Sequence, residues 1–255
     1  MGWNLGAGLD GKGVIVTGAG GGIGRSVTKA FSAAGARVLA VDVQQSKVDE
    51  VVDELEGPGH AAVACDLSDP TTHRPLVEKA VQTFGGLFVL ASLAAVLRRR
   101  ATVDDVTEED WDFQLDTNLK AVFFLCRAAA RAMIDKGEGG RLITFTSQGW
   151  WTGGFGGSVV YAASKGGIVS MTRGLARTYG PHQITANSVS PGQVHTPMLM
   201  TDLPKEIYES MKAQTPLGYV AEPDAIAGPV VFLASRHASY ITGATLNVSG
   251  GFLMY

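Results

Sequence analysis

Short apolar runs alternate with longer segments of helical periodicity along almost the whole chain of 255 residues. The apolar runs, rich in β-branched residues, predict strands at 13–17, 37–42, 61–65, 88–93, 141–147, 184–190 and 244–248. The segments between them predict helices at 22–34, 45–55, 70–84, 107–135, 161–179 and 224–235. This alternation predicts an α/β fold in which a seven-stranded parallel sheet is doubly wound, with helices on both faces.

The chain is predicted to form a single domain over residues 1–255, because it contains no internal repeat, low-complexity tract or linker. The segment 192–223 holds Pro197, Pro204 and Pro216, too many prolines for one helix, and is too long for a simple connection. It is interpreted as a substrate loop or lid. In parallel sheets of this kind, ligands bind beyond the carboxyl ends of the strands, so functional residues are sought directly after each strand.

Composition excludes several classes of function. The net charge of −3 gives no general attraction to nucleic acid or to anionic membranes. The two cysteines, Cys65 and Cys126, lack any CxxC or metal-ligand spacing, which favours reduced thiols in a cytoplasmic protein and no metal site. No targeting segment is visible, and the longest apolar run, 87–97, is too short to span a bilayer. A soluble, cytoplasmic protein is expected.

A glycine-rich turn, T-G-A-G-G-G-I-G at 17–24, lies between the first predicted strand and the first helix. Glycines let the backbone approach a pyrophosphate, and the helix amino terminus offers free N–H groups with a partial positive charge. Alone, such a turn is weak support for a dinucleotide site, but its position strengthens the interpretation.

Asp42 ends the second strand, eighteen positions after Gly24. A carboxylate there accepts hydrogen bonds from both ribose hydroxyls of the adenosine half and repels a 2′-phosphate. Positions 19 and 43 are Ala19 and Val43, which cannot neutralise such a phosphate, so NAD is favoured over NADP. Asp66 ends the third strand, where it either reaches the adenine amino group or caps the following turn.

Tyr161 and Lys165 stand four residues apart in a predicted helix, which places the phenol and the ammonium on one face. A free tyrosine titrates near ~10, too high for a base at neutral pH. An ammonium ~5 Å away, at an effective dielectric constant of about 20, contributes roughly 3 kcal/mol, which would lower the pKa of the phenol by ~2.4. The alternative is a core phenol beside a surface lysine that reaches solvent.

Taken together, these motifs resemble the short-chain dehydrogenase/reductase family. The matching pieces occur in family order from about residue 9 to the terminal V-S-G-G, and they are T-G-x-x-x-G-I-G, Asp42, Asp66-Leu67, Asn118, Ser147, Tyr161/Lys165 and P-G-Q-V-H-T at 191–196. The resemblance implies a Rossmann-type fold and a catalytic set of Asn118, Ser147, Tyr161 and Lys165. It also implies NAD contacts from Gly18, Gly22, Ile23, Gly24, Asp42, Val43, Asp66, Leu67, Ala94, Tyr161, Lys165, Pro191, Gly192, Val194 and Thr196.

One segment departs from the family pattern. After the fourth strand the family usually has Asn-Asn-Ala-Gly, whereas this chain has S-L-A-A at 92–95. The family's asparagine ties neighbouring strands together beside the cofactor. Ser92 can supply only part of that role and Leu93 none, and Ala95 replaces the glycine that allows close approach to the cofactor.

Two further features bear on the substrate. The loop between Ser147 and Tyr161 holds Trp150, Trp151 and Phe155; in an extended segment the adjacent tryptophans would point to opposite sides, one of them into the substrate pocket. The alternative is that these aromatic residues only pack the loop or a subunit contact. The triplet R-R-R at 98–100 is interpreted as a solvated turn. The alternative is that these arginines bind a substrate that bears a carboxylate or a phosphate.

The resemblance implies an NAD-dependent dehydrogenase acting on a secondary alcohol or its ketone, and the aromatic loop favours a ring-containing small molecule, either a sugar or polyol or a cyclic or aromatic alcohol. The alternatives are an NADPH-dependent 3-oxoacyl-carrier-protein reductase and a non-catalytic dinucleotide-sensing regulator. Small and apolar residues in the helices at 107–135 and 161–179, and the apolar tail at 251–255, suggest subunit contacts. A homotetramer is expected.

Overall fold

A computed structural model describes residues 6–154, 156–201 and 203–255. Its strands are β1 (Gly13–Thr17), β2 (Arg37–Asp42), β3 (Ala61–Ala64), β4 (Val89–Ser92), β5 (Gly140–Phe145), β6 (Ile184–Pro191) and β7 (Thr245–Val248). Its helices are α1 (Gly22–Ala33), α2 (Gln45–Asp53), α3 (His73–Phe84), α4 (Glu108–Leu115), α5 (Ala121–Lys136), α6 (Gly149–Thr152), α7 (Val159–Tyr179), α8 (Pro197–Met200), α9 (Lys205–Gln214) and α10 (Asp224–Ala234). The strands form one parallel sheet in the order β3-β2-β1-β4-β5-β6-β7, which confirms the predicted α/β architecture.

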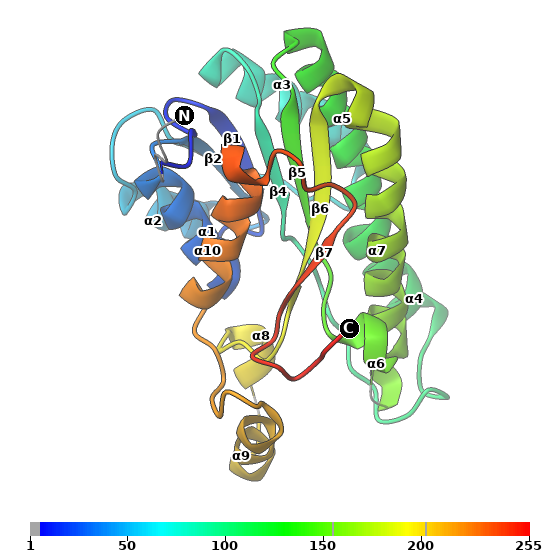
Figure 1. The fold of residues 1–255 in the computed structure, drawn as a ribbon. Coiled ribbons are helices and arrows are strands. Elements are labelled where there is room, and N and C mark those ends of the chain that lie inside the picture. Colours follow the sequence, from blue (N-terminus) through cyan, green and yellow to red (C-terminus); the bar gives the residue numbers. More distant parts are fainter. Residues whose placement is uncertain (1–5, 155, 202) are drawn as a thin grey trace.

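Helices cover both faces of the sheet, with α1, α2 and α10 on one side and α3, α5 and α7 on the other (Figure 1). Successive side chains of a strand point to opposite faces, so each face has its own apolar core. In β1, Ile15 packs with α3, α5 and α7, whereas Val14 and Val16 pack with α1 and α10. Burial on both faces explains why the strands are continuous apolar runs rather than alternating ones.

The strand order reverses at β1, which has β2 on one side and β4 on the other. Chain connections leave in opposite directions from this pair, so a crevice opens outside their carboxyl ends, where dinucleotides bind in such sheets. In Figure 1, α6, α8, α9 and the carboxyl terminus all lie at that same edge of the molecule. The fold thus brings the segments that follow the strands together at one edge of the sheet.

The predicted helix at 107–135 is present as an unbroken helical segment, but it is not α-helical throughout. It consists of α4, a π-helical turn at Asp116–Lys120 and α5. Asn118 lies in this turn, which agrees with the poor helix propensity of asparagine and with the tendency of π-turns to occur at functional sites.

The segment 192–223 contains two helices, α8 and α9. Pro197 occupies the first turn of α8, where a missing backbone N–H costs nothing, and Pro204 immediately precedes α9. The helix α9 has no buried residue and projects from the sheet (Figure 1). Within the described residues, no helix is both long and apolar enough to cross a membrane.

Candidate active site

The glycine-rich turn joins β1 to α1 and lies against two other segments. Gly18 has a φ of +67°, and a Cβ there would lie 2.9 Å from the backbone nitrogen of Ala94, so only glycine fits without strain. A Cβ on Gly22 would lie 2.9 Å from Cγ2 of Thr196. The first turn of α1 therefore adjoins the segments that follow both β4 and β6.

The amino terminus of α1 suits an anionic group. Gly21 is the N-cap residue and provides no side-chain hydrogen bond, so the first N–H groups of the helix are open to a ligand. Ile23 is half-buried against the core, and Gly24 is buried within α1. These residues fit the pyrophosphate of a dinucleotide.

Asp42 ends β2 and is held in place by the backbone. Its Oδ2 accepts from the N–H of Gly20 at 3.1 Å, and its Oδ1 accepts from the N–H of Val43 at 2.8 Å. The carboxylate thus lies beside the glycine-rich turn, with Val43 exposed next to it. Lys47, in α2, also approaches this turn, since a Cβ on Gly20 would lie 2.8 Å from its Cβ. A cation therefore lies near the adenosine end of the proposed site although neither Ala19 nor Val43 supplies one.

Asp66 follows β3 and makes the contacts of a turn residue. Its Oδ1 accepts from the backbone N–H of Ser68 at 2.9 Å and from the Ser68 hydroxyl at 2.7 Å. Of the two roles expected for Asp66, contact with the adenine amino group and capping of the following turn, the structure therefore contains the turn cap. Leu67 is buried in the core on the α3 side.

The segment 191–196 follows β6. A Cβ on Gly192 would lie 2.6 Å from Cα of Ser249, so this glycine lets the chain pass close to the end of β7. Val194 is buried and forms a bridge with Ala221. Thr196 is thereby placed against α1.

Tyr161, Lys165 and Ser147 meet at the carboxyl end of β5. The hydroxyl of Ser147 hydrogen-bonds the phenol of Tyr161. Nζ of Lys165 lies 5.6 Å from the centroid of the Tyr161 ring and donates to the carbonyl of Phe145 at 3.0 Å. Thr146 Oγ1 donates to the carbonyl of Lys165 at 2.8 Å, so two bonds fix α7 to the end of β5.

The pKa values in this group differ from the sequence-based estimate. Burial raises the pKa of Tyr161, opposed by the hydrogen bond from Ser147 and by the charge of Arg99. Burial lowers the pKa of Lys165 to about 8. The expectation of a lowered Tyr161 pKa is thus wrong for the folded chain, because both groups are desolvated and burial outweighs the attraction between them.

Asn118 is fully buried, and its side chain joins two segments. Its Oδ1 accepts from the N–H of Val96 and its Nδ2 donates to the carbonyl of Val96, both at 2.8 Å. Its Nδ2 also lies 3.3 Å from Oγ of Ser164, which donates to the carbonyl of Tyr161 at 2.7 Å. Asn118 thereby links the segment after β4 to the helix that carries Tyr161.

The atypical segment 92–95 is tied to β1 by Thr17. Oγ1 of Thr17 accepts from the N–H groups of Leu93 and Ala94 at 3.1 and 3.2 Å. Ser92 is buried, and Leu93 packs against the core on the α1 side. A residue of β1 therefore supplies a link between the strands that neither Ser92 nor Leu93 was expected to supply in full.

Trp150 and Trp151 lie in α6 rather than in an extended segment, so the expectation that they point to opposite sides is wrong. Their rings meet edge to face, with centroids 5.2 Å apart. Tyr255, at the carboxyl terminus, contacts Trp150 edge to face and stacks on Trp151 at 5.5 Å. Helical backbone turns consecutive side chains by about 100° rather than 180°, which allows this three-ring cluster. Phe155 lies outside the described residues.

The fold brings Ser147, Tyr161 and Lys165 into one group and connects Asn118 to it through Ser164. The glycine-rich turn, Ala94 and Thr196 form a second group at the same edge of the sheet. Sequence reasoning missed Thr17, Lys47 and Tyr255, all of which act through contacts distant in sequence. Of these three residues, Thr17 alone belongs to a recognisable sequence motif, because it begins the glycine-rich turn at the end of β1.

Comparison with known proteins agrees with this geometry. The family model described as "Enoyl-(Acyl carrier protein) reductase" matches residues 18–253. A (3R)-3-hydroxyacyl-CoA dehydrogenase of Mus musculus is 36% identical over 249 residues, covering 94% of this chain and 95% of that protein. An L-rhamnose 1-dehydrogenase (NAD(P)(+)) of Sphingomonas sp. (strain SKA58) is 39% identical over 251 residues, covering 95% and 96%.

A solved structure shows the same architecture. The chain resembles a short-chain dehydrogenase/reductase of Brucella melitensis, described as glucose/ribitol dehydrogenase, with a TM-score of 0.89 and 32% identity over 97% of this chain and 98% of that one. The matches span nearly the full length in sequence and in structure. The chain therefore belongs to the short-chain dehydrogenase/reductase family, and it is an oxidoreductase that acts on hydroxyl or keto groups of a small-molecule substrate with a nicotinamide dinucleotide.

Proposed function

We propose that this protein is an NAD-dependent dehydrogenase that interconverts a ring-containing secondary alcohol and its ketone. The observation that carries the proposal is the grouping of the Tyr161 phenol with the Ser147 hydroxyl, which acts to lower the pKa of the phenol, and with the buried Nζ of Lys165, 5.6 Å from the Tyr161 ring centroid and one turn along the same helix. A phenol, a hydroxyl and an ammonium so arranged suit proton transfer at a substrate oxygen.

Each of these side chains has a distinct role in the proposal. Tyr161 donates the proton to the oxygen of a ketone, or takes it from an alcohol, and Ser147 holds that oxygen through its hydroxyl. A bound nicotinamide gives or takes the hydride at the adjacent carbon. The raised pKa of Tyr161 keeps its proton on at neutral pH. For oxidation the phenol must lose that proton, and the charge of Lys165, whose Nζ lies 5.6 Å from the ring centroid, acts in the direction that favours the phenolate without outweighing burial. Asn118 positions Tyr161 through Ser164.

The preference for NAD rests on Asp42. Backbone N–H groups of Gly20 and Val43 orient its carboxylate at the adenosine end of the proposed site. A carboxylate in that position binds ribose hydroxyls and repels a 2′-phosphate. Lys47 is the nearby residue that opposes this preference, since its ammonium would attract such a phosphate.

The ring-containing substrate rests on the segment directly after Ser147. Trp150, Trp151 and Tyr255 offer flat apolar surfaces there. Among the described residues, Oε1 of Gln148 and Nε1 of Trp150 are buried without a hydrogen-bond partner. Unpaired buried groups of this kind cost about 1–3 kcal/mol each, and a sugar or polyol whose binding opened this cluster would offer hydroxyls to both the acceptor and the donor.

A 3-hydroxyacyl thioester is the second candidate substrate. It is favoured by the relatives, because the protein of Mus musculus that is 36% identical is described as a (3R)-3-hydroxyacyl-CoA dehydrogenase. The segment 192–223, which we propose to be the substrate lid of a single catalytic domain, carries the exposed helix α9 and could cover either kind of substrate.

The test is a screen of NAD reduction across sugars, cyclic alcohols, aryl alcohols and 3-hydroxyacyl thioesters. The best kcat/KM is expected on a ring compound, and Tyr161→Phe should lower kcat on it by ~10²-fold or more while leaving NADH binding nearly intact. Ser164→Ala, which alters a positioning contact rather than a reacting group, serves as the comparison and should cost less. Best activity on the thioesters would select the second candidate, and a Tyr161→Phe variant with more than about a tenth of the wild-type kcat would exclude the proposed acid/base role.

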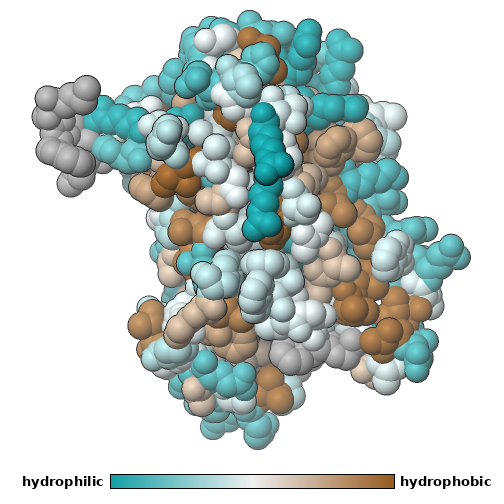
Figure 2. Space-filling model, turned by 45° about the vertical axis from the view of Figure 1, so that its right-hand side comes forward, coloured by the Kyte–Doolittle hydropathy of each residue, from teal (hydrophilic) through white to brown (hydrophobic). Residues whose placement is uncertain are grey.

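We also propose that four copies assemble through α5 and α7. Figure 2 shows apolar atoms gathered on the side of the molecule where these helices lie, and Phe123 on α5 is 40% exposed. At Gly166 and Gly174 of α7, no atom of the described residues outside the local helix backbone lies within 4 Å of the position of a Cβ, so this helix presents a surface on which another helix can pack closely.

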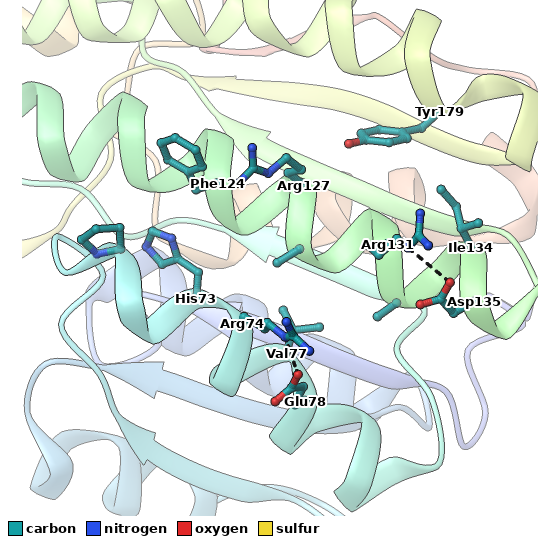
Figure 3. Close-up of a pocket in the computed structure, with 13 residues that line it drawn as sticks. His73, Arg74, Val77, Glu78, Phe124, Arg127, Arg131, Ile134, Asp135 and Tyr179 are labelled. Atoms are coloured by element: carbon teal, nitrogen blue, oxygen red, sulfur yellow. Dashed lines mark hydrogen bonds and ion pairs between the residues drawn. The ribbon is translucent and has the colours of Figure 1, made fainter.

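Beside this surface lies a groove of about 810 Å³ between α3 and α5 (Figure 3). Charged side chains border it, and the dashed lines of Figure 3 mark the pairs Arg74–Glu78 and Arg131–Asp135, each within one helix. None of the proposed catalytic residues lines the groove. We interpret it as the rim of the proposed subunit contact rather than as a substrate site.

A further inference from the structure

Three consecutive arginines follow β4, and the structure assigns two of them to one carboxylate. Nε and Nη2 of Arg100 donate to the two carboxylate oxygens of Asp110, each at 2.7 Å. Arg98 donates to Glu109 at 3.0 Å and to Asp110 at 3.4 Å, and its guanidinium lies 4.0 Å from the centroid of the Phe113 ring. Asp110 is buried, and Arg100 holds its pKa well below the usual range. These two arginines fix the segment to α4.

Arg99 differs from its two neighbours. Its side chain is exposed, and within the part of the chain that the structure describes no hydrogen bond or ion pair engages its guanidinium. The backbone that carries it is held on both sides, because Arg98 and Arg100 are anchored to Asp110. An unpaired guanidinium is therefore presented from a fixed backbone.

The position of Arg99 is next to the proposed catalytic group. The carbonyl of Arg100 accepts from the N–H of Gly157, two residues before α7 begins. On the other side, Asn118 holds Val96 by two hydrogen bonds of 2.8 Å. The charge of Arg99 also acts on the phenol of Tyr161, which places the guanidinium within electrostatic reach of the proposed proton donor.

A cavity of about 470 Å³ opens at this point. The segment after β4, residues 95–99, forms one wall, and α8 with Pro197 and Met198 forms the other. The wall residues Ala95, Val96, Leu97 and Met198 are apolar, and the charged groups lining the cavity are Arg98 and Arg99. Because Arg98 is paired with Glu109 and Asp110, Arg99 is the lining cation whose charge is available to a ligand.

We propose that Arg99 binds an anionic group of the substrate, a carboxylate or a phosphate, in the cavity between the segment after β4 and α8. The planar guanidinium has two parallel N–H donors that match both kinds of oxyanion. The apolar wall excludes water from one side of such a pair, which strengthens it relative to a pair in open solvent. This inference rests on the proposed function and narrows its substrates to acidic ones, such as hydroxy acids.

The test uses pairs of alcohols that differ only in charge. The probes are cis-3-hydroxycyclohexanecarboxylate with its amide, glucose 6-phosphate with glucose, and 3-hydroxybutyryl-CoA with the corresponding N-acetylcysteamine thioester, which lacks the phosphates. The wild-type protein should favour the charged member of at least one pair by ~10-fold or more in kcat/KM. Whether the preferred member is the carboxylate, the sugar phosphate or the CoA thioester identifies the source of the anion.

Arg99→Gln should lower kcat/KM for the preferred charged probe by ~10-fold or more, mainly through KM, and change its neutral partner by less than ~3-fold. Arg99→Lys should retain part of the preference, since it keeps the charge but loses the paired donors. Lys79→Gln, at an exposed position of α3 outside the groove of Figure 3, is the control and should change neither probe. Affinity for NADH should be unaltered in all three variants.

Two outcomes would overturn the inference: equal loss on charged and neutral probes in Arg99→Gln, or no loss on the charged probe. If the wild-type protein turns over none of the alcohols, the proposed function fails while the inference is still tested by calorimetry. Titration of the cyclohexane acid and its amide into the NADH complex should show tighter binding of the acid, abolished in Arg99→Gln. Equal affinity for the acid and the amide in that titration would contradict the proposed role of Arg99 in binding an anion.

Discussion

At the scale of single residues, the ammonium group of Lys165 is buried, and burial disfavours its charged form. The side chain is 3% exposed, and burial lowers its pKa to about 8 from an ordinary value of 10.5. Between these values the unfolded chain holds the proton more tightly than the folded chain, so the free energy of unfolding rises with pH there. At about 1.4 kcal/mol per pH unit, the whole change is worth roughly 3 kcal/mol.

Replacement of Lys165 by methionine removes this dependence. The stability of Lys165→Met relative to wild type should be greatest at pH 7 and should decline as pH rises from about 8 toward 10, as measured by urea unfolding at each pH. The lost hydrogen bond to Phe145 shifts all points equally and leaves the slope as the diagnostic. A stability difference that is constant, or that grows with pH, would contradict the assigned pKa.

Asp42 and Lys47, at the adenosine end of the proposed site, have opposed effects on the choice between NAD and NADP. We expect kcat/KM for NAD to exceed that for NADP by at least ~30-fold, because two ribose hydrogen bonds to a charged group are worth a few kcal/mol. Asp42→Ala should reduce the ratio of kcat/KM for NAD to kcat/KM for NADP. Lys47→Ala should raise this ratio by lowering kcat/KM for NADP. Asp53→Ala, at the exposed end of α2, is the control for charge alone. Equal rates with both dinucleotides in the wild-type protein would refute this assignment.

At the scale of elements, β1 and β4 are joined beyond their ladder by one hydroxyl. Oγ1 of Thr17 accepts from two consecutive N–H groups, and Thr17 is fully buried. The sequence S-L-A-A at 92–95 lacks the asparagine with which the family ties these strands together. The structure shows that β1 contributes to the junction from the opposite side.

Thr17→Val keeps the shape of the side chain and removes the acceptor. Two partly buried N–H groups then lose their partner, at about 1–2 kcal/mol each, so stability should fall by roughly 2–4 kcal/mol in denaturant unfolding. NADH affinity, measured by calorimetry, should fall as well, because Ala94 lies against Gly18 of the glycine-rich turn. Thr17→Ser restores the acceptor and should recover most of both losses; a Thr17→Val protein equal to wild type in both measurements would show that the hydroxyl is dispensable.

At the scale of the whole molecule, α5 and α7 pack on one face of the sheet and keep outer surfaces that are exposed among the described residues, as at Phe123 and Gly174. Gly174 lies on this outer surface, with no atom within 4 Å of the position of a Cβ. A substitution there leaves the folded protomer undisturbed and acts on whatever packs against α7.

Sedimentation of the wild-type protein should give the mass of four copies of the 26.7 kDa chain. Gly174→Glu places a bulky charge in the proposed contact and should yield a smaller species with an unchanged circular dichroism spectrum. Ser46→Glu, on the exposed side of α2, serves as the control and should remain a tetramer. A Gly174→Glu protein that also remains a tetramer would place the subunit contact elsewhere.

The sequence by itself determined the order and type of the main elements. Buried parallel strands must be apolar on both faces, so runs such as 13–17 and 184–190 are recognisable without knowledge of their partners. The glycine-rich turn and the spacing of Tyr161 and Lys165 are likewise local, because a turn and a helix face are defined within a few residues. These local features were sufficient to indicate the fold and the family.

Tertiary structure decided the features that depend on contacts between distant segments. The pKa of Tyr161 follows from burial by neighbouring segments, and Trp150 meets Tyr255 only because the carboxyl terminus folds back beside α6. In the same way, one run of three arginines becomes two ion pairs to Asp110 and one guanidinium that no described residue pairs with. Desolvation and pairing depend on atoms brought together across the chain, and no periodicity in the sequence records which residues those will be.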